Sequence, residues 1–244
     1  MKKLGVIPAR YNSTRFEGKP LAIINGHTMI EWVYKRTLKS NLDEVIVATD
    51  DKRIYDEVIR FGGKVMLTSK KHETGTDRIV EVAKQYTDFD IIINIQGDEP
   101  LIETSIINEL ANAFEEDKID MASVKYKIED KNEIENPNAV KVVTDKNNFA
   151  MYFSRSPIPY PRKKENIEYY KHIGIYGYRR EFLLKYSEME ITKLERNESL
   201  EQLRALENGY KIKMIETKHK VWGVDTPEDL HNVEAIISER NIEI

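Results

Sequence analysis

The chain of 244 residues contains no cysteine, and this absence excludes several kinds of chemistry. Without thiols it can form no disulfide framework, no thiolate metal site and no cysteine nucleophile. It also lacks any run approaching about 18 apolar residues, which a membrane-spanning helix requires. The opening MKKLGVIPAR holds too few apolar residues for the core of a signal peptide. We therefore expect a soluble protein of the cytoplasm with no membrane partner.

Two glycine patterns for phosphate binding and an excess of basic residues are missing as well. Neither GxxxxGKS nor GxxxxGKT occurs, and no GxGxxG follows a predicted strand, which counts against a dinucleotide-dependent oxidoreductase. The formal net charge of −4 at pH 7 argues against a general nucleic-acid binder. The remaining composition, 40% hydrophobic and 33% charged, is that of an ordinary globular protein.

In the first half of the chain, short β-branched runs alternate with helical patterns. The runs are almost continuously apolar, which is typical of buried parallel strands. Strands are predicted at residues 4–7, 45–48, 65–67 and 91–95, and helices at residues 29–39, 54–61, 77–86 and 106–114. This alternation predicts an α/β fold whose central sheet is mainly parallel, with helices on both faces.

From about Met121 the pattern changes. Strands are predicted at residues 121–127, 140–144 and 150–153, joined by turns with no helix between them. A helix at 200–206, a strand at 212–215 and a closing helix at 227–237 follow. We expect a nucleotide-binding core of residues 1–120 and 205–244, with an inserted mixed or antiparallel region of residues 121–204.

The segment VIPARYNSTRFEGKPL begins at the end of the first predicted strand and continues into a loop that is rich in positive charge. It contains Arg10, Arg15 and Lys19 together with Ser13 and Gly18. Such a loop could surround a polyanion such as a nucleoside triphosphate, with the glycine letting the backbone come close. A solvated basic turn is the alternative.

Two aspartates are candidate metal ligands. Asp98 follows an apolar strand in QGDEP, and Asp225 lies in GVDTPEDL. Helix capping explains Thr226, Pro227 and Asp229 but leaves Asp225 without a role, although turn aspartates are common. Two carboxylates without histidine or cysteine suit Mg²⁺, and beside a cationic loop they suggest transfer at a phosphorus centre.

HETGTDR predicts a helix start in which Thr74 and Thr76 act as caps around Gly75. Arg78 would then lie in the first turn, where it opposes the helix dipole, and a nearby anionic ligand would explain it.

Three further segments hold polar residues without a clear structural task. In HIGIYGY, His172 and Tyr176 share one face of a predicted strand, which could be a sugar platform, an exposed sheet edge or a subunit interface. Arg155 follows a strand in YFSR, and Glu201 and Gln202 lie in LEQLR, where surface solvation is the default.

The order of these motifs is more informative than any one of them. IPARYNSTRFEGKP, ATDD, ETGTDR, INIQGDEPLI, NPNAVKVV, YFSRSPIP, KHIGIYGYRREF, LEQLRALENG and GVDTPEDL follow one another from Leu4 to about Leu230. Together they resemble the 3-deoxy-manno-octulosonate cytidylyltransferases, or CMP-Kdo synthetases. The PAR…GKP opening is shared by other nucleotidyltransferases, whereas HIGIYGY with YFSR and LEQLR is more specific.

The resemblance implies a Mg²⁺-dependent reaction of CTP with a 3-deoxy-2-ulosonic acid, giving a CMP-sugar and pyrophosphate for lipopolysaccharide synthesis. It implies the nucleotide-diphospho-sugar transferase fold and a homodimer formed through the inserted region. A related ulosonic acid, of the 8-amino-Kdo or sialic-acid type, is the alternative acceptor. A non-catalytic nucleotide-binding protein would leave Asp98 and Asp225 with no shared task.

The resemblance also implies roles for residues at matching positions. Arg10, Ser13, Arg15 and Lys19 would contact the triphosphate; Thr74, Gly75, Arg78 and Gln96 the cytidine; Asp98 and Asp225 the metal; and Arg155, His172, Tyr176, Glu201 and Gln202 the sugar acid. Lys19, Arg10 and the two aspartates would be catalytic. One departure is Phe16-Glu17, where the family often has leucine and proline, so an acid stands beside the phosphates.

Overall fold

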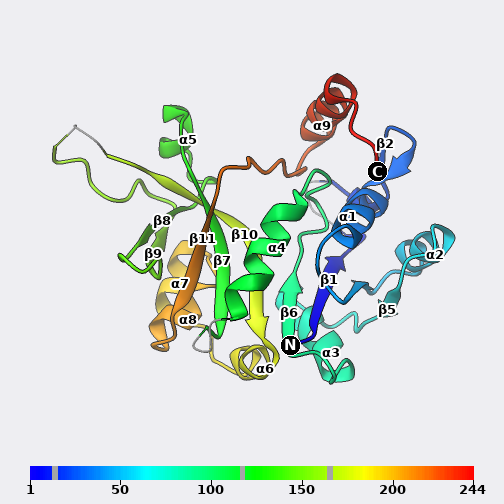
Figure 1. Ribbon diagram of the computed structural model, residues 1–244, viewed down its shortest axis with the longest axis horizontal. Helices are drawn as coiled ribbons and strands as arrows, with labels where there is room; N and C mark the ends of the chain where they lie inside the picture. The colour runs from blue at the N-terminus through cyan, green and yellow to red at the C-terminus, as the bar shows by residue number, and fades with distance from the viewer. Residues whose placement is uncertain (13–15, 116–118, 164–166) are drawn as a thin grey trace.

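The computed structural model describes residues 1–12, 16–115, 119–163 and 167–244. Within these residues a nine-stranded mixed sheet crosses the molecule, with a path in the order β11-β7-β10-β6-β1-β4-β5 (Figure 1). Strand β8 pairs with β10 and β9, off this path. The predicted class, a mainly parallel sheet covered by helices with an antiparallel extension, is confirmed.

The first half forms the parallel part of the sheet. Its strands are β1 (Lys3–Ala9), β4 (Glu44–Thr49), β5 (Val65–Leu67) and β6 (Ile91–Asn94), with a small hairpin of β2 (Ile23–Ile24) and β3 (His27–Thr28). Its helices are η1 (Lys19–Leu21), α1 (Met29–Leu38), α2 (Lys52–Arg60), α3 (Gly75–Gln85), α4 (Thr104–Asn112) and η2 (Ala113–Glu115). All four predicted strands and helices of this half are confirmed, with ends that shift by a few residues.

The second half adds antiparallel neighbours. Its strands are β7 (Met121–Lys127), β8 (Lys141–Thr144), β9 (Ala150–Ser154), β10 (Tyr170–Arg179) and β11 (Ile212–Thr217). Its helices are α5 (Lys131–Glu135), α6 (Arg180–Ser187), α7 (Lys193–Glu198), α8 (Leu203–Glu207) and α9 (Pro227–Arg240). Strand β10 is antiparallel to both β6 and β7, whereas β11 is parallel to β7.

The expectation that no helix separates the strands after Met121 was wrong. Helix α5 lies between β7 and β8, and the Asp130 carboxylate caps it by accepting a hydrogen bond from the backbone N–H of Asn132 at 2.9 Å. The helix has five residues and buries none of them, so it carries no apolar periodicity that could reveal it.

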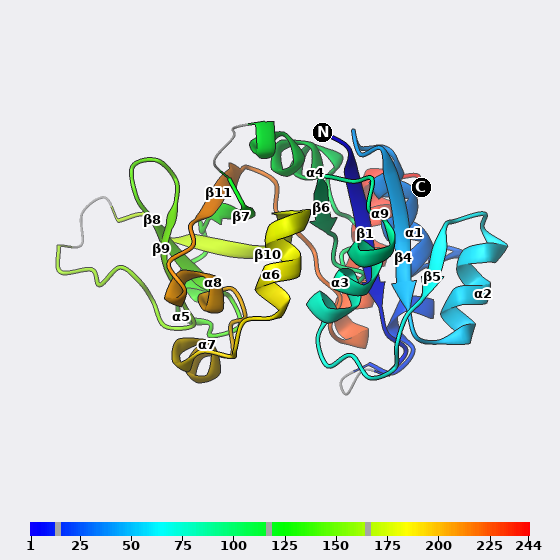
Figure 2. The same ribbon diagram turned by 90° about the horizontal axis from the view of Figure 1, so that it is seen from below.

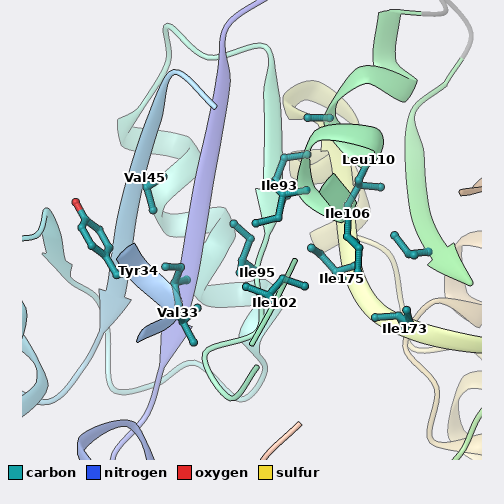
Figure 3. Close-up of a cluster of buried hydrophobic side chains, with 14 of the residues drawn as sticks. Val33, Tyr34, Val45, Ile93, Ile95, Ile102, Ile106, Leu110, Ile173 and Ile175 are labelled. Atoms are coloured by element: carbon teal, nitrogen blue, oxygen red, sulfur yellow. The ribbon is translucent and has the colours of Figure 1, made fainter. Parts of the chain in front are cut away.

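Apolar clusters cover both faces of the sheet. Helices α1, α2 and α4 pack on one face, and α3, α6 and α8 on the other, where α3 and α6 lie side by side (Figure 2). In the first cluster, Ile106 and Leu110 of α4 pack with Ile93 of β6 and Ile175 of β10 (Figure 3). Helix α4 therefore bridges the parallel and the antiparallel parts of the sheet.

The strand directions bring several loops to one rim. Strands β1, β4 and β6 are mutually parallel, so the segments that follow them open at the same edge, where α/β sheets bind ligands. The chain returns to this edge after β11, crossing the top of Figure 1 to reach α9. Helix α9 packs there through Val233 and Ile237 against Ile24 and Trp32.

The predicted boundaries at 120/121 and 204/205 stay a prediction. Pairing of β11 with β7 joins residues 212–217 to the second half of the sheet, and α9 rejoins the first. Among the described residues, no helix is both long enough and apolar enough to cross a membrane.

Candidate active site

A pocket of about 610 Å³ opens at the carboxyl ends of β1 and β6. It is lined by Pro8, Ala9, Arg10, Asn12, Lys19, Pro20, Gly75, Gln96, Gly97 and Asp98. The loops after the two strands approach each other closely here, since a Cβ on Gly97 would lie 2.9 Å from the carbonyl oxygen of Pro8. Only glycine permits that approach.

The loop after β1 is closed by its own backbone. The N–H of Gly18 donates to the carbonyl of Tyr11 at 2.9 Å, and Gly18 has the left-handed φ of +71°. The guanidinium of Arg53 stacks on the Tyr11 ring, 3.2 Å from its centroid. This closure fixes the start of η1 and with it Lys19. The predicted triphosphate ligands Ser13 and Arg15 lie outside the described residues.

Lys19 lies where the two predicted metal ligands meet. Its Nζ donates to Asp98 Oδ2 at 2.7 Å, to the Val224 carbonyl at 2.9 Å and to Asp225 Oδ1 at 3.4 Å. The N–H of Val224 donates in turn to the Asp98 carbonyl at 2.9 Å. Two segments far apart in the sequence are thus joined at one cation.

Helix capping holds Asp225 in this position. Thr226 caps α9 in a capping box with Asp229, as predicted. The Asp229 carboxylate also accepts a hydrogen bond from the backbone N–H of Asp225 at 3.0 Å. The backbone of Asp225 is therefore part of the cap, while its side chain reaches Lys19.

Asp98 and Asp225 fit a hard divalent cation. A positive charge, the ammonium of Lys19, already lies between their oxygens. Magnesium is commonly held by one or two carboxylates, with phosphate oxygens and water completing its octahedron. Among the described residues no group of three or more histidine, cysteine, aspartate or glutamate side chains forms a metal cage. A metal here would therefore depend on oxygens from a substrate.

Arg10 presents an unused donor beside this centre. Its Nη1 donates to the Glu73 carbonyl at 2.8 Å, whereas Nη2 is buried and has no hydrogen-bond partner among the described residues. Burial, and secondarily the charge of Arg78, lowers the pKa of Arg10. A buried cationic donor without a partner fits an anion that would approach through the pocket.

The start of α3 is capped by Thr74 as predicted, and Arg78 has an anionic partner within the chain. Thr74 caps the helix in a capping box with Asp77, and Gly75 lines the pocket. Arg78 is fully buried, with Nη2 3.0 Å from the carboxylate of Asp50. An anion beside Arg78 is thus supplied by the chain itself, and the contact with cytidine that the resemblance implies stays a prediction.

Gln96 connects the pocket to β10. Its Nε2 donates to the Gly174 carbonyl at 2.6 Å. Gly174 lies where the pairing of β10 with β7 shifts register, between Ile173 and Tyr176. The Ser123 hydroxyl lies 3.1 Å from the Ile173 carbonyl and 2.9 Å from that of Ile175, so its one proton can bond to either backbone carbonyl at the irregularity.

His172 is a neutral, buried side chain. Its Nε2 lies 2.9 Å from Ser123 Oγ. Because the Ser123 hydroxyl has one proton and three acceptors within reach, the donor in this pair depends on which ring nitrogen of His172 carries the hydrogen. Burial lowers the pKa of His172 to about 3.

The rings on β10 share a face, as predicted. His172 lies 4.9 Å from Phe153 and 5.3 Å from Tyr176, between ring centroids, and Tyr176 stacks on Tyr178 at 6.0 Å. Burial raises the pKa of Tyr176 well above its ordinary value. An exposed sheet edge therefore does not describe this face.

Glu201 and Gln202 are not solvated surface residues. Thr76 donates to Glu201 Oε2 at 3.1 Å, and burial raises the pKa of Glu201. Gln202 is buried, and its Nε2 has no hydrogen-bond partner among the described residues. Both lie at the start of α8, which therefore faces the start of α3.

Arg155 is held by backbone carbonyls. Its Nε donates to Glu198 at 2.7 Å, Nη1 to Pro137 at 3.0 Å and Nη2 to Ser199 at 3.3 Å. These bonds fix the guanidinium at the end of β9 and leave two of its five N–H groups for another acceptor.

Sequence reasoning missed several residues that shape the site. Asp50 was visible in ATDD but its pairing with Arg78 depends on the approach of β4 to α3. No sequence pattern around Ser123 marks it as part of the site. Lys141 interrupts an apolar run in NPNAVKVV, which could have marked it; it is fully buried and donates to the Asn136 carbonyl at 2.9 Å.

The family model described as cytidylyltransferase matches residues 4–213. The chain belongs to the cytidylyltransferase family. The 3-deoxy-manno-octulosonate cytidylyltransferase of Fusobacterium nucleatum subsp. nucleatum is 64% identical, and the alignment covers all of both chains. The protein of the same name from Geotalea daltonii is 51% identical over 98% of this chain and all of its own length.

Solved structures agree with this family. A CMP:2-keto-3-deoxy-manno-octonic acid synthetase complexed with CTP superimposes with a TM-score of 0.95 at 44% identity, covering 98% of this chain and 100% of the other. A 4-diphosphocytidyl-2C-methyl-D-erythritol synthase from Anaerococcus prevotii, at 15% identity and a TM-score of 0.64, shows the fold alone. The resemblance inferred from the motif order is confirmed.

Proposed function

We propose that this cytidylyltransferase activates 3-deoxy-manno-octulosonate (Kdo) with CTP, giving CMP-Kdo and pyrophosphate for lipopolysaccharide synthesis. Relatives named for this activity match the chain over its whole length at 64% and 51% identity. The structure of a CMP:2-keto-3-deoxy-manno-octonic acid synthetase with CTP supports the nucleotide. The single observation in this chain that carries the chemistry is the contact of Lys19 with both Asp98 and Asp225 at the rim of the pocket.

The pocket would hold the triphosphate through positive groups on three elements. Arg10 would donate its unpartnered Nη2 to a phosphate oxygen, and Lys19 would neutralise charge on the α-phosphate and the leaving group. Gly75 places the first turn of α3 at the pocket, where a helix N-terminus favours an anion. Glu17 is exposed and is not one of the residues that line the pocket, so its charge need not oppose the phosphates.

The oxygen of the sugar's anomeric hydroxyl would form a bond to the α-phosphorus while the bond to pyrophosphate breaks, and the hydroxyl proton would pass to water. Asp98 and Asp225 would hold Mg²⁺, and the chemistry that this ion supplies when bound is a lower pKa for the attacking hydroxyl and an oriented phosphate. No dedicated protein base is then needed. Arg10 and Lys19 stabilise the charge that develops on the leaving group.

The sugar acid would bind on the β10 side. Gln202 offers an unpartnered amide N–H, and neutral His172 and Tyr176 offer polar groups on an aromatic face suited to a sugar. The two remaining N–H groups of Arg155 suit the sugar's carboxylate. Gln96, bonded to Gly174, stands between this side and the nucleotide pocket.

We also propose a cytoplasmic homodimer formed through the inserted region. In this region β9 pairs with β8 as an antiparallel hairpin. The side chains of Met151 in β9 and Tyr160 in the following loop are exposed there. Sedimentation of the purified chain tests this assignment; a monomer at micromolar concentration would contradict it.

The proposed reaction is tested with a matrix of nucleoside triphosphates against ulosonic acids, read by pyrophosphate release. CTP with Kdo should give the highest kcat/KM. Faster turnover of 8-amino-Kdo or a sialic acid would replace Kdo as the acceptor. If no triphosphate and sugar acid react together, the enzymatic assignment fails.

A further inference from the structure

We infer that Lys19 is an internal counter-cation that competes with the divalent metal for Asp98 and Asp225, and that the triphosphate relieves this competition by drawing the ammonium to itself. Metal binding would thereby be coupled to nucleotide binding. This inference rests on the proposed function, from which it takes the metal and CTP. It adds a step in which one side chain exchanges partners.

Each hydrogen of the Lys19 ammonium has an acceptor within the chain. An ammonium has three hydrogens, and Nζ has three acceptors, on Asp98, Val224 and Asp225, at 2.7, 2.9 and 3.4 Å. The side chain of Lys19 is 14% exposed, against 32% for Asp98 and 49% for Asp225. The cation is therefore the innermost of the three groups, and the carboxylates are oriented around it.

A second cation at the same carboxylates meets a strong repulsion. A divalent ion bound to Asp98 would lie within a few ångströms of the ammonium, a distance at which like charges repel strongly even with the screening found near a protein surface. The carboxylates can satisfy either cation well, but not both at close range. While Lys19 keeps these contacts, the two aspartates should bind metal weakly.

CTP offers Lys19 an alternative set of acceptors. Lys19 lines the same pocket as Arg10 and Gly75, where the phosphates are proposed to bind. A lysine suits such an exchange because its compact charge sits on a flexible four-carbon stem. Once the ammonium contacts phosphate, both carboxylates become available to the metal. The two ligands then favour each other's binding by the same factor.

The test measures metal binding without turnover. Mn²⁺ is titrated into the full-length chain in the absence of nucleotide, and free Mn²⁺ is counted by electron paramagnetic resonance. Lys19→Gln, which keeps a hydrogen-bond donor but removes the charge, should bind Mn²⁺ on the order of tenfold more tightly than the wild type, or more. Lys19→Arg, which keeps the charge, should bind as weakly as the wild type.

A matched control removes an equivalent charge elsewhere. Lys52 is exposed on α2 and pairs with Asp56 on the same helix. Lys52→Gln should leave Mn²⁺ affinity unchanged, which separates the local exchange from a general change in net charge. Equal or weaker Mn²⁺ binding by Lys19→Gln than by the wild type would overturn the inference.

Two further variants separate this inference from the metal assignment. Asp98→Asn and Asp225→Asn, each combined with Lys19→Gln, should lose the added affinity. If no form of the protein binds Mn²⁺, with or without CTP, the proposed metal site itself fails. If Asp98→Asn weakens Mn²⁺ binding but Lys19→Gln does not strengthen it, the metal site stands and the competition is refuted.

Folding of the key variant is checked in the same series. In Lys19→Gln the two carboxylates lose their shared cation, so its melting temperature should fall in metal-free buffer. Added Mn²⁺ should raise that temperature more than it does for the wild type. The same or a smaller rise would count against the competition, even if the variant is too unstable for titration.

Discussion

The nucleotide side and the sugar side of the site are built from different kinds of groups. On the nucleotide side, Lys19, Asp98 and Asp225 are charged, and both aspartates remain partly open to solvent. On the sugar side, His172 is buried and neutral, and Gln202 is buried and uncharged. A triphosphate and a metal need charge that can be rearranged, whereas a sugar acid needs neutral donors and acceptors for its hydroxyls and one fixed cation, here Arg155, for its carboxylate. The two sides thus match the two proposed substrates.

The sides meet through hydrogen bonds rather than through shared charges. Gln96 of the nucleotide pocket donates to Gly174 on β10, and Thr76 of α3 donates to Glu201 beside α8. Both bonds run from the parallel half of the sheet to the antiparallel half. In the proposed reaction they would set the separation between the attacking hydroxyl and the α-phosphorus, and proximity of this kind contributes strongly to catalysis.

Removal of a carboxylate from the nucleotide side should have the largest effect. We expect Asp98→Asn or Asp225→Asn to lower kcat by at least on the order of 10²–10³, because the metal loses a ligand that it needs in the transition state. Each variant leaves Lys19 two of its three acceptors, so the fold should survive with only a modest fall in melting temperature. Pyrophosphate release at limiting Mg²⁺ is the measurement, with the surface variant Asp56→Asn as control. Turnover like that of the wild type by either site variant would refute the metal assignment.

Burial of His172 on the sugar side should make the free energy of unfolding depend on pH. The folded-state pKa of His172 is about 3, well below its ordinary value of 6.5, because the ring is buried. Between these values the unfolded chain binds a proton that the folded chain does not. The free energy of unfolding should therefore fall as pH drops below about 6.5, by up to about 1.4 kcal/mol per pH unit from this residue.

Urea unfolding of the wild type and of His172→Gln at pH 7, 6 and 5 isolates this contribution, because all other titrating groups are common to both proteins. The difference in the free energy of unfolding between them should shrink as the pH falls. A difference that stays constant from pH 7 to pH 5 would mean that His172 titrates normally.

The same contrast explains what the sequence could predict. The nucleotide side carries local signals: cations crowded in one loop, an aspartate at a strand end, and Asp225 left over once capping had explained Thr226 and Asp229. Once the strand order is known, these residues can be placed together at one edge of the sheet. The anion near Arg78 was also expected, but its identity as Asp50 depends on how β4 meets α3.

The sugar side depends on tertiary packing. Nothing within LEQLR shows that Gln202 is buried or that Glu201 is partly covered, because both effects come from the packing of the segment before α8 near the start of α3. Ser123 bonds to β10 only because the pairing of β10 with β7 shifts register there, and no residue of β7 predicts that shift. The alternation in HIGIYGY did predict that the rings share a face, since strand periodicity is local.

A conservative change at Arg10 should separate the two sides kinetically. Arg10→Lys keeps the charge and can still donate to the Glu73 carbonyl, but it loses the second arm of the guanidinium, Nη2. We expect KM for CTP to rise on the order of tenfold, as for the loss of one charge-assisted hydrogen bond, while KM for Kdo changes less than twofold. Steady-state kinetics with each substrate varied in turn provides the measurement. Equal changes in both KM values would show that Arg10 does not belong to the nucleotide side alone.

The smallest effect is expected where the two sides join. Thr76→Val keeps the shape of the side chain but removes the hydroxyl that donates to Glu201 Oε2 at 3.1 Å. Because Glu201 is then left with one acceptor unpaired, the free energy of unfolding should fall by about 1 kcal/mol. The sugar site should also shift relative to the nucleotide, so kcat should fall severalfold with little change in KM for CTP. Asp77, the other half of the capping box at the start of α3, gives a useful comparison: Asp77→Ala removes the carboxylate that accepts from the backbone N–H of Thr74 at 2.9 Å, a cap of similar value, about 1 kcal/mol, and leaves the hydroxyl bonded to Glu201 in place. If both variants lose stability but only Thr76→Val loses turnover, the hydrogen bond between the halves positions the substrates; equal losses of turnover would assign the effect to fraying of α3 instead.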